Sequence, residues 1–124
     1  MYKINLISKL CDKYPQKLLK IPDSPDILFA IGNLSLLNTF SLAIVGSRNY
    51  TLDAQTLTEK LVKDLVNQGI TIISGMARGI DSIAHKACIS AGGNTIAILG
   101  CGFESVQHQK IFNQILENNR TNNQ

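Results

Sequence analysis

The stretch from Ile70 to Gly102 constrains the fold of this 124-residue chain more than any other. It begins with a β-branched run at Ile70–Ile73 and closes on a second apolar run at Thr95–Leu99. Short runs of this composition are typical of strands that are buried on both faces of a sheet. Because a helical pattern separates them, the two runs predict a βαβ unit with parallel strands and a right-handed crossover.

The segment between the two runs has the periodicity of an amphipathic helix. Asp81 stands at its start, where a carboxylate can cap the helix or lie in the first turn and interact favourably with the helix dipole. Gly92 and Gly93 mark its end. The apolar face of this predicted helix consists of Ile80, Ile83, Ala84, Ala87, Cys88 and Ala91.

The chain on either side of this unit continues the alternation. Leu42–Val45 predicts a strand, a helix follows from a cap at Asp53 to Gln68, and a last helix is expected over residues 106–118. We therefore expect an α/β fold with a partial Rossmann-like, doubly wound parallel sheet of three strands. The apolar side of the helix after Asp53 consists of Leu57, Leu61, Val62, Leu65 and Val66.

The first 39 residues predict a lead-in to this domain. Residues 1–12 have the spacing of a short amphipathic helix, which Tyr14 and Pro15 would stop. Residues 27–31 predict a strand, which is a candidate for a fourth strand of the sheet. We expect the lead-in to end at residue 39, the Rossmann-like domain to span residues 40–118, and a polar disordered tail to occupy residues 119–124.

Composition indicates the cellular setting. The net charge is +3, and the first twenty residues hold five lysines against one aspartate. This start predicts either a basic face for polyanions or an ordinary solvated surface. Three cysteines without a CxxC pair indicate neither a disulfide framework nor a zinc site, which fits a reducing cytosol. Because the sequence shows no secretory signal and no apolar span of membrane length, we expect a cytoplasmic protein without membrane contact.

Three glycine-containing turns follow the predicted strands, at Gly46–Arg48, Ser74–Gly79 and Gly100–Gly102. In open α/β sheets, ligands bind beyond the carboxyl ends of the strands. Glycines let backbone amides approach an anion, and the start of the following helix adds its dipole. Arg48 and Arg78 would grip a phosphate with their guanidinium forks, and Ser47 would add a hydroxyl donor. The turns therefore predict either phosphate recognition or simply tight strand-to-helix connections.

The sequence lacks known catalytic and nucleotide-binding motifs. It has neither GxGxxG nor GxxxxGK[ST], and it lacks the PGGxGTxxE stretch of the phosphoribohydrolases that release cytokinin-type bases. Asp81 and His85 are spaced to pair on one helix face, but no nucleophile is placed to use them, so we interpret the pair as structural. Ser74 lacks the GxSxG context of a nucleophile and is expected to be a turn hydroxyl. We predict no catalytic residue, no metal and no cofactor.

Several spaced motifs together resemble the DprA/Smf family of bacterial DNA-processing proteins. Ala43–Arg48 (AIVGSR) is similar to the opening VGSR motif of that family, and Tyr14–Asn33 (YPQKLLKIPDSPDILFAIGN) is similar to its usual lead-in. Ser74–His85 (SGMARGIDSIAH) and Gly92–Gly102 (GGNTIAILGCG) resemble the central signature. The motifs occur in the family's order, so the resemblance is more specific than a single glycine pattern.

The resemblance implies a protein of competence and natural transformation that binds single-stranded DNA and loads the RecA recombinase onto it. Members act without metal or nucleotide, usually as dimers, so a homodimer is expected and enzymatic activity is not. Tyr50 and Phe103 would be candidates for base stacking, and Phe103 is also expected near the core. The DNA- or phosphate-binding residues that the resemblance implies are Gly46, Ser47, Arg48, Ser74, Gly75, Arg78 and Gly79.

Departures from the family pattern predict a shortened and impaired member. Thr51–Ala54 (TLDA) stands where the family has TPYG, and Glu104–His108 (ESVQH) stands where it continues to a Tyr-Pro pair. The FPxRNR segment, which helps to hold DNA in the family, and the later strands have no counterpart here. Two alternatives stay open. One is a phosphoribohydrolase-like nucleotide-binding enzyme that uses the same turns. The other is a fragment without function of its own, or one that pairs its open sheet edge with a separate chain.

Overall fold

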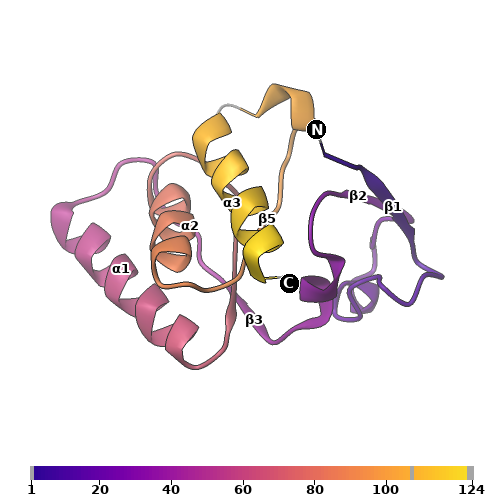
Figure 1. The fold of residues 1–124 in the computed structure, drawn as a ribbon, viewed down its shortest axis with the longest axis horizontal. Helices are drawn as coiled ribbons and strands as arrows, with labels where there is room; N and C mark the ends of the chain where they lie inside the picture. The colour runs from indigo at the N-terminus through magenta and orange to yellow at the C-terminus, as the bar shows by residue number, and fades with distance from the viewer. Residues whose placement is uncertain (1, 107, 123–124) are drawn as a thin grey trace.

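The computed structural model describes residues 2–106 and 108–122 (Figure 1). Within these residues the chain forms an antiparallel pair of strands in the lead-in and a parallel sheet of three strands in the main domain. The strands are β1 (Asn5–Ser8), β2 (Ile27–Ala30), β3 (Ser41–Ala43), β4 (Thr71–Ser74) and β5 (Thr95–Ala97). The helices are α1 (Leu52–Asn67), α2 (Ile80–Ser90) and α3 (Gln109–Asn122), and short 3₁₀ helices span Leu18–Lys20, Leu34–Asn38 and Phe103–Ser105.

The parallel sheet has the strand order β3–β4–β5, with Leu42 beside Ile72 and Ile72 beside Thr95. A helix joins each strand to the next, as the sequence predicted for the central βαβ unit. Right-handed crossovers in sequential strand order place α1 and α2 on the same face of the sheet. Figure 1 shows α1, α2 and α3 side by side. The predicted α/β class with a partial Rossmann-like sheet is confirmed.

The core lies between this helix layer and the sheet. Ile72 on β4 packs with Val62 of α1 and with Ala84 and Cys88 of α2, and all four side chains are fully buried. The apolar face predicted for α2 therefore packs against the sheet. A second cluster connects α3 to the chain around β5 and consists of Met76, Val106, Ile111, Phe112 and Ile115.

The opposite face of the parallel sheet carries no α-helix among the described residues. Side chains alternate along a strand, so Ile73 and its neighbour Ile96 point away from the helices. Both are only partly buried, and Ile98, just beyond β5, is 61% exposed. Parallel sheets are normally covered on both faces. Among the described residues, α-helices therefore cover one face of the sheet only.

The amphipathic helix predicted over residues 1–12 is wrong, because Asn5–Ser8 forms the strand β1. β1 pairs antiparallel with β2, with Leu6 opposite Phe29. Ile7 is buried whereas Leu6 is 66% exposed, which is the alternation of a strand. The partner strand is distant in the sequence, so local spacing could not reveal the pairing. The strand predicted at residues 27–31 exists as β2, but it belongs to this separate sheet and not to the parallel one.

Polar contacts fold the lead-in onto itself. Tyr14 is fully buried, and its hydroxyl donates to the carbonyl of Pro25 at 2.6 Å. The side-chain amide of Asn38 donates to the carbonyls of Lys13 and Tyr14, and its oxygen accepts from the backbone N–H of Gln16. These contacts tie the first half of the lead-in to the segment that enters β3.

Helix α1 differs from the prediction at its cap and on its apolar side. Its N-cap is Thr51, whose hydroxyl accepts from the backbone N–H of Ala54 at 3.1 Å, while Asp53 lies in the first turn. Leu57 and Leu61, which the predicted apolar side includes, are 67% and 45% exposed. The face of α1 that packs against the sheet therefore includes fewer of its apolar residues than the sequence predicted.

The chain around β5 and α3 also departs from the predicted boundaries. β5 ends at Ala97, two residues before the predicted strand end at Leu99. Helix α3 begins at Gln109 and continues to Asn122. Residues 119–122 are therefore helical where a disordered tail was expected, and residues 123–124 of that tail lie outside the described residues.

The cap of α1 can be tested with a pair of variants. Thr51→Ala removes the hydroxyl that accepts the Ala54 N–H and should lower the free energy of unfolding by about 1 kcal/mol. Asp53→Ala removes only a favourable charge near the helix dipole and should cost roughly 0.3 kcal/mol. Urea unfolding monitored by circular dichroism measures both. A larger loss for Asp53→Ala would show that the cap is assigned to the wrong residue.

Candidate functional site

The turns that follow β3 and β4 lie against each other at the start of α2. Gly79 has a φ of 86°, and a Cβ at this position would lie 2.6 Å from the Cα of Arg48. The backbone N–H of Ile80 donates to the carbonyl of Ser47 at 3.2 Å. A Cβ at Gly46 would lie 2.8 Å from the Cβ of Ile80. The glycines are thus required by close packing of one turn on the other, and the structure brings together two of the three predicted turns.

The carboxylate of Asp81, in the first turn of α2, occupies the backbone amides at the ends of both strands. Its Oδ2 accepts from the N–H of Gly75 at 3.1 Å and its Oδ1 accepts from the N–H of Gly46 at 3.4 Å. The Asp81 side chain is buried, and a Cβ at Gly75 would lie 2.9 Å from Oδ2. The amides of Gly46 and Gly75, which we expected to cradle an external anion, therefore bind a carboxylate of the chain itself. Sequence reasoning placed Asp81 in the first turn but missed these partners.

The His85 side chain, on α2, hydrogen-bonds to the backbone of the turn that follows β4. Met76 has a φ of 57°, which is unfavourable for a side chain of its type, and its N–H donates to His85 Nε2 at 3.2 Å. Since Nε2 accepts, Nδ1 carries the proton and donates to Thr95 Oγ1 at 2.8 Å. Thr95 Oγ1 in turn donates to the carbonyl of Ile72 at 2.9 Å. This chain of hydrogen bonds links α2 to both β4 and β5.

Burial keeps His85 neutral. The side chain is fully buried, and desolvation lowers its pKa to about 4, against the opposing attraction of the Asp81 carboxylate. The two residues do lie on one helix, but each is bonded to a turn or a strand and not arranged around a nucleophile. The interpretation of this pair as structural is consistent with these contacts.

Ser74 and Cys88 are also held inside the fold. Ser74 is buried at the end of β4 and not in the turn where it was expected, and its hydroxyl donates to the carbonyl of Ile44 at 2.6 Å, so its side chain is not available to a ligand. The thiol of Cys88 contacts the carbonyl of Asn94 at 3.2 Å. Burial raises the pKa of Cys88 to about 11, which makes it an inert core residue.

The side chains that remain exposed on the paired turns are polar and cationic. Ser47, Arg48 and Arg78 are exposed, and the Ser47 hydroxyl accepts from the N–H of Asn49 at 3.0 Å. Within residues 2–106 and 108–122, neither guanidinium forms an ion pair or a hydrogen bond. Tyr50, next along the same loop, is 45% exposed. Two unpaired positive charges therefore project from loops that are packed together.

Phe103 lies in an aromatic cluster. Its ring centroid is 6.5 Å from those of Tyr2 and Phe112, and the Tyr2 and Phe112 rings are themselves 5.7 Å apart. Phe103 also packs against the core cluster around α3. These contacts support packing as its role and not base stacking. The third predicted turn, before Phe103, contributes Cys101 and Gly102 to the lining of an apolar cavity of about 480 Å³ between the lead-in, β5 and α3.

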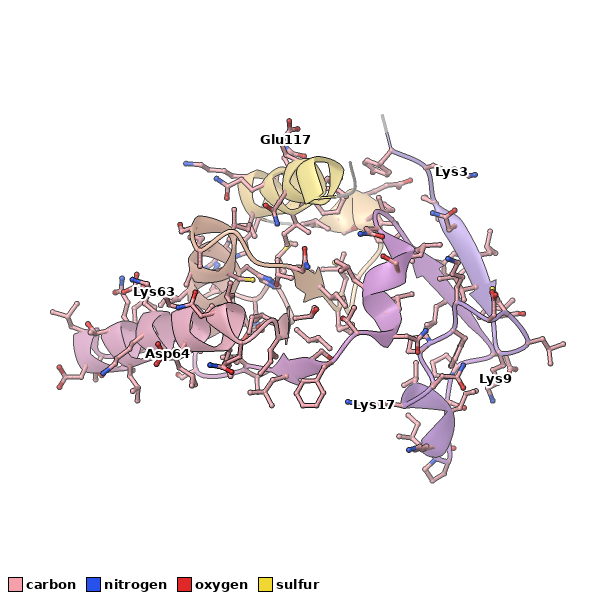
Figure 2. All side chains as sticks on the ribbon, turned by 60° about the horizontal axis from the view of Figure 1, so that its bottom comes forward. Lys3, Lys9, Lys17, Lys63, Asp64 and Glu117 are labelled. Carbon is pink, nitrogen blue, oxygen red and sulfur yellow. The ribbon has the colours of Figure 1, made fainter. Side chains whose placement is uncertain are left out.

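Three of the lead-in lysines, Lys3, Lys9 and Lys17, do not form one cluster. Figure 2 shows Lys3 well apart from Lys9 and Lys17. Lys9 pairs with Asp26 at 3.3 Å, and Lys17 lies over the ring of Phe40, 5.4 Å from its centroid. The alternative of an ordinary solvated surface therefore fits these residues better than a polyanion-binding face.

The part of the chain that the structure describes holds no candidate metal-binding cluster and no helix that could span a membrane. No group of three histidine, cysteine, aspartate or glutamate side chains is close enough there to hold a metal ion. None of the helices described has both the length and the apolar composition needed to cross a bilayer.

The packing of the two turns can be tested at Gly79. Gly79→Ala adds both backbone strain and a methyl group that collides with the Ser47–Arg48 backbone, whereas Gly69→Ala, at a φ of 78° with no atom nearby, adds strain alone. We expect Gly79→Ala to cost at least about 1 kcal/mol more than Gly69→Ala. Urea unfolding measures the difference. Equal costs would mean that the turns are not in contact.

The state of His85 predicts a specific acid sensitivity. Its pKa in the folded chain, about 4, lies below the ordinary value of 6.5, so protonation favours the unfolded chain. The contribution of neutral His85 to the free energy of unfolding should be fully present well above pH 6.5 and should decline as the pH falls toward 4. The loss between pH 7 and pH 5 should be about 2 kcal/mol. His85→Gln keeps an acceptor for the Met76 N–H but cannot be protonated. Its free energy of unfolding, measured over the same pH range, should not show this loss. An identical pH profile for both proteins would contradict the assignment.

Comparison with known proteins places this arrangement in a family. The family model of DNA recombination-mediator protein A matches residues 5–121. Protein Smf of Escherichia coli strain K12 is 38% identical over 116 residues, and DNA processing protein DprA of Streptococcus pneumoniae is 42% identical over 102 residues. The two matches cover 91% and 82% of this chain but 31% and 36% of the relatives. The chain thus spans about a third of the curated relatives that it matches.

Solved structures agree with the sequence matches. The crystal structure of DprA from Streptococcus pneumoniae is similar with a TM-score of 0.83 and 39% identity, over 91% of this chain and 41% of that chain. DNA processing protein A from Helicobacter pylori, reported for its mode of binding single-stranded DNA, has a TM-score of 0.73 and 26% identity, over 94% of this chain and 51% of that chain. The chain therefore belongs to the DNA recombination-mediator protein A family, known as DprA or Smf.

Proposed function

We propose that this chain binds single-stranded DNA through the loops that follow β3 and β4. The observation that carries the proposal is the pair of exposed, unpaired arginines, Arg48 and Arg78, on two turns that pack against each other. A guanidinium binds a phosphate through two parallel hydrogen bonds, and two such groups on adjoining loops suit successive phosphates of one strand. Ser47 would add a hydroxyl contact.

Tyr50 is the candidate for a base contact. It follows Arg48 on the same loop and is 45% exposed, so part of its side chain is accessible. Stacking of a base on an aromatic ring tolerates any sequence and contributes about 1–3 kcal/mol per base. A site made of guanidiniums and one aromatic ring would therefore favour single strands without strong sequence preference.

Family membership supports the wider role that we propose. The relative from Helicobacter pylori is reported as a binder of single-stranded DNA, and the relative from Streptococcus pneumoniae is named as a DNA processing protein. We propose that the chain acts without catalysis in DNA processing during natural transformation, in the cytoplasm, and that it cooperates with the RecA recombinase. A homodimer is part of the same proposal. Because the chain spans about a third of the length of these relatives, each of these roles has to be measured on this chain.

The nucleotide-binding enzyme is disfavoured by the contacts around α2. Ser74 and His85 are buried and bonded to the main chain, and the amides of Gly46 and Gly75 bind Asp81. No nucleophile or free amide cradle is thus available at these positions.

Near-UV circular dichroism of the purified chain tests the other alternative, a fragment without function, because a chain that lacks fixed packing would lose its aromatic signal.

The salt dependence of binding tests the proposed site. Affinity for a fluorescein-labelled oligo(dT) should fall with salt, with a log–log slope of about −0.7 per phosphate contact. Arg48→Ala and Arg78→Ala should each make the slope less steep by about 0.7. Lys63→Ala removes the same charge from α1, on the side of the molecule away from the lead-in (Figure 2), and should leave the slope unchanged.

Fluorescence anisotropy between about 50 and 200 mM salt measures these slopes. Unchanged slopes in both arginine variants would remove these loops from the site. A change of slope in Lys63→Ala as large as that in Arg48→Ala would show that binding responds to net charge alone. Absence of any binding by the folded wild-type chain would contradict the proposed function itself.

A further inference from the structure

We infer that Asp81 is a positioning and specificity-determining residue of the proposed DNA site. This inference rests on the proposed function and goes beyond it. Asp81 locks the Arg48 and Arg78 loops in one arrangement, and it fills with its own carboxylate the amide cradle that a single phosphate group would need. The site therefore recognises a strand through side chains and discriminates against free phosphate and mononucleotides.

The locking follows from the contacts of the two carboxylate oxygens. Oδ1 takes the N–H of Gly46, two residues before Arg48, and Oδ2 takes the N–H of Gly75, three residues before Arg78. Asp81 itself is fixed on the first turn of α2, where the neighbouring Ile80 N–H bonds to Ser47. One buried side chain thus joins the ends of β3 and β4 to one helix. A hydrogen bond from an amide to a carboxylate is stronger than one between neutral groups, which suits it to this purpose.

The discrimination follows from the position of these amides. Backbone N–H groups that converge at the carboxyl ends of strands and at a helix N-terminus form a ready anion site. Here both amides already donate to the Asp81 carboxylate, which lies so close to Gly75 that a Cβ there would come within 2.9 Å of Oδ2. A phosphate approaching the same amides would meet a negative charge. Phosphates are accordingly left to the exposed guanidiniums of Arg48 and Arg78, which lie on two loops in contact and can bind a strand that passes over both.

Two variants separate the parts of this inference. Asp81→Ala removes the carboxylate and frees both amides. Asp81→Asn keeps one acceptor oxygen but puts an NH₂ donor where the other oxygen was. The single acceptor should keep the shorter bond, to Gly75, and release Gly46. Asp64→Ala is the matched control, because Asp64 is an exposed aspartate on α1, next to Lys63 in Figure 2, and the charge change is the same.

The first measurement uses ¹⁵N–¹H spectra and inorganic phosphate. In the wild type and in Asp64→Ala, the Gly46 and Gly75 amide signals should not respond to phosphate. In Asp81→Ala both should shift in a saturable way with phosphate, and in Asp81→Asn the Gly46 signal should move further from its wild-type position than the Gly75 signal, which keeps an acceptor. A shift of both wild-type signals with phosphate would overturn the inference, because the amides would then be free. If Asp81→Ala does not fold, the Asp81→Asn spectrum decides, and an unmoved Gly46 signal would contradict the locking.

The second measurement compares affinities for oligo(dT) and for thymidine monophosphate. We expect Asp81→Ala to lower the ratio of the two affinities about tenfold, since two charge-assisted contacts become available to a single phosphate. Asp64→Ala should leave the ratio unchanged. An unaltered ratio in Asp81→Ala would refute the specificity role even where the protein folds. A wild type that binds no oligo(dT) would defeat the proposed function, while the phosphate titration would still judge the filled cradle separately.

Discussion

The buried carboxylate of Asp81 is the interaction on which the rest of this structure depends. A carboxylate in a protein interior is costly unless its charge is compensated, and here two backbone amides and the N-terminus of α2 compensate it. In return, the carboxylate fixes the ends of β3 and β4 relative to the helix. In that arrangement Gly46 and Gly79 approach other segments so closely that a Cβ at either position would collide.

His85 extends the same arrangement to the third strand of the described sheet. Its ring bridges the strained Met76 amide and the Thr95 hydroxyl, so a backbone conformation that would be unfavourable alone is held by a buried hydrogen bond. Together Asp81 and His85 place two side chains of one helix against all three strands of the parallel sheet within the described residues. Loops held in this way pay little ordering entropy when they bind a ligand, which favours recognition by exposed side chains of a fixed geometry.

The sequence could predict those parts of the molecule whose signals are local. The β4–α2–β5 unit is coded by apolar runs and helical spacing within one stretch, and it formed as expected. The strand β1 could not be predicted, because the same spacing of Ile4 and Ile7 suits a helix until a distant partner supplies the hydrogen bonds. The candidate site divided similarly. Glycines marked two turns that the structure brings into contact, but the partner of their amides is a side chain of the chain itself, which no motif for external anions would indicate.

The uncovered face of the parallel sheet bears on whether such a site can exist in this chain. Ile98 on that face is exposed and Ile73 and Ile96 are only partly buried, whereas the clusters built on Ile72 and on Met76 lie toward the helices. Every contact that shapes the two turns, through Asp81, His85 and Ser74, runs to α2, β5 or between adjacent strands. None of these contacts depends on a layer over the second face. The geometry of the Arg48 and Arg78 loops is therefore set by the covered side of the sheet, whatever packs against the other.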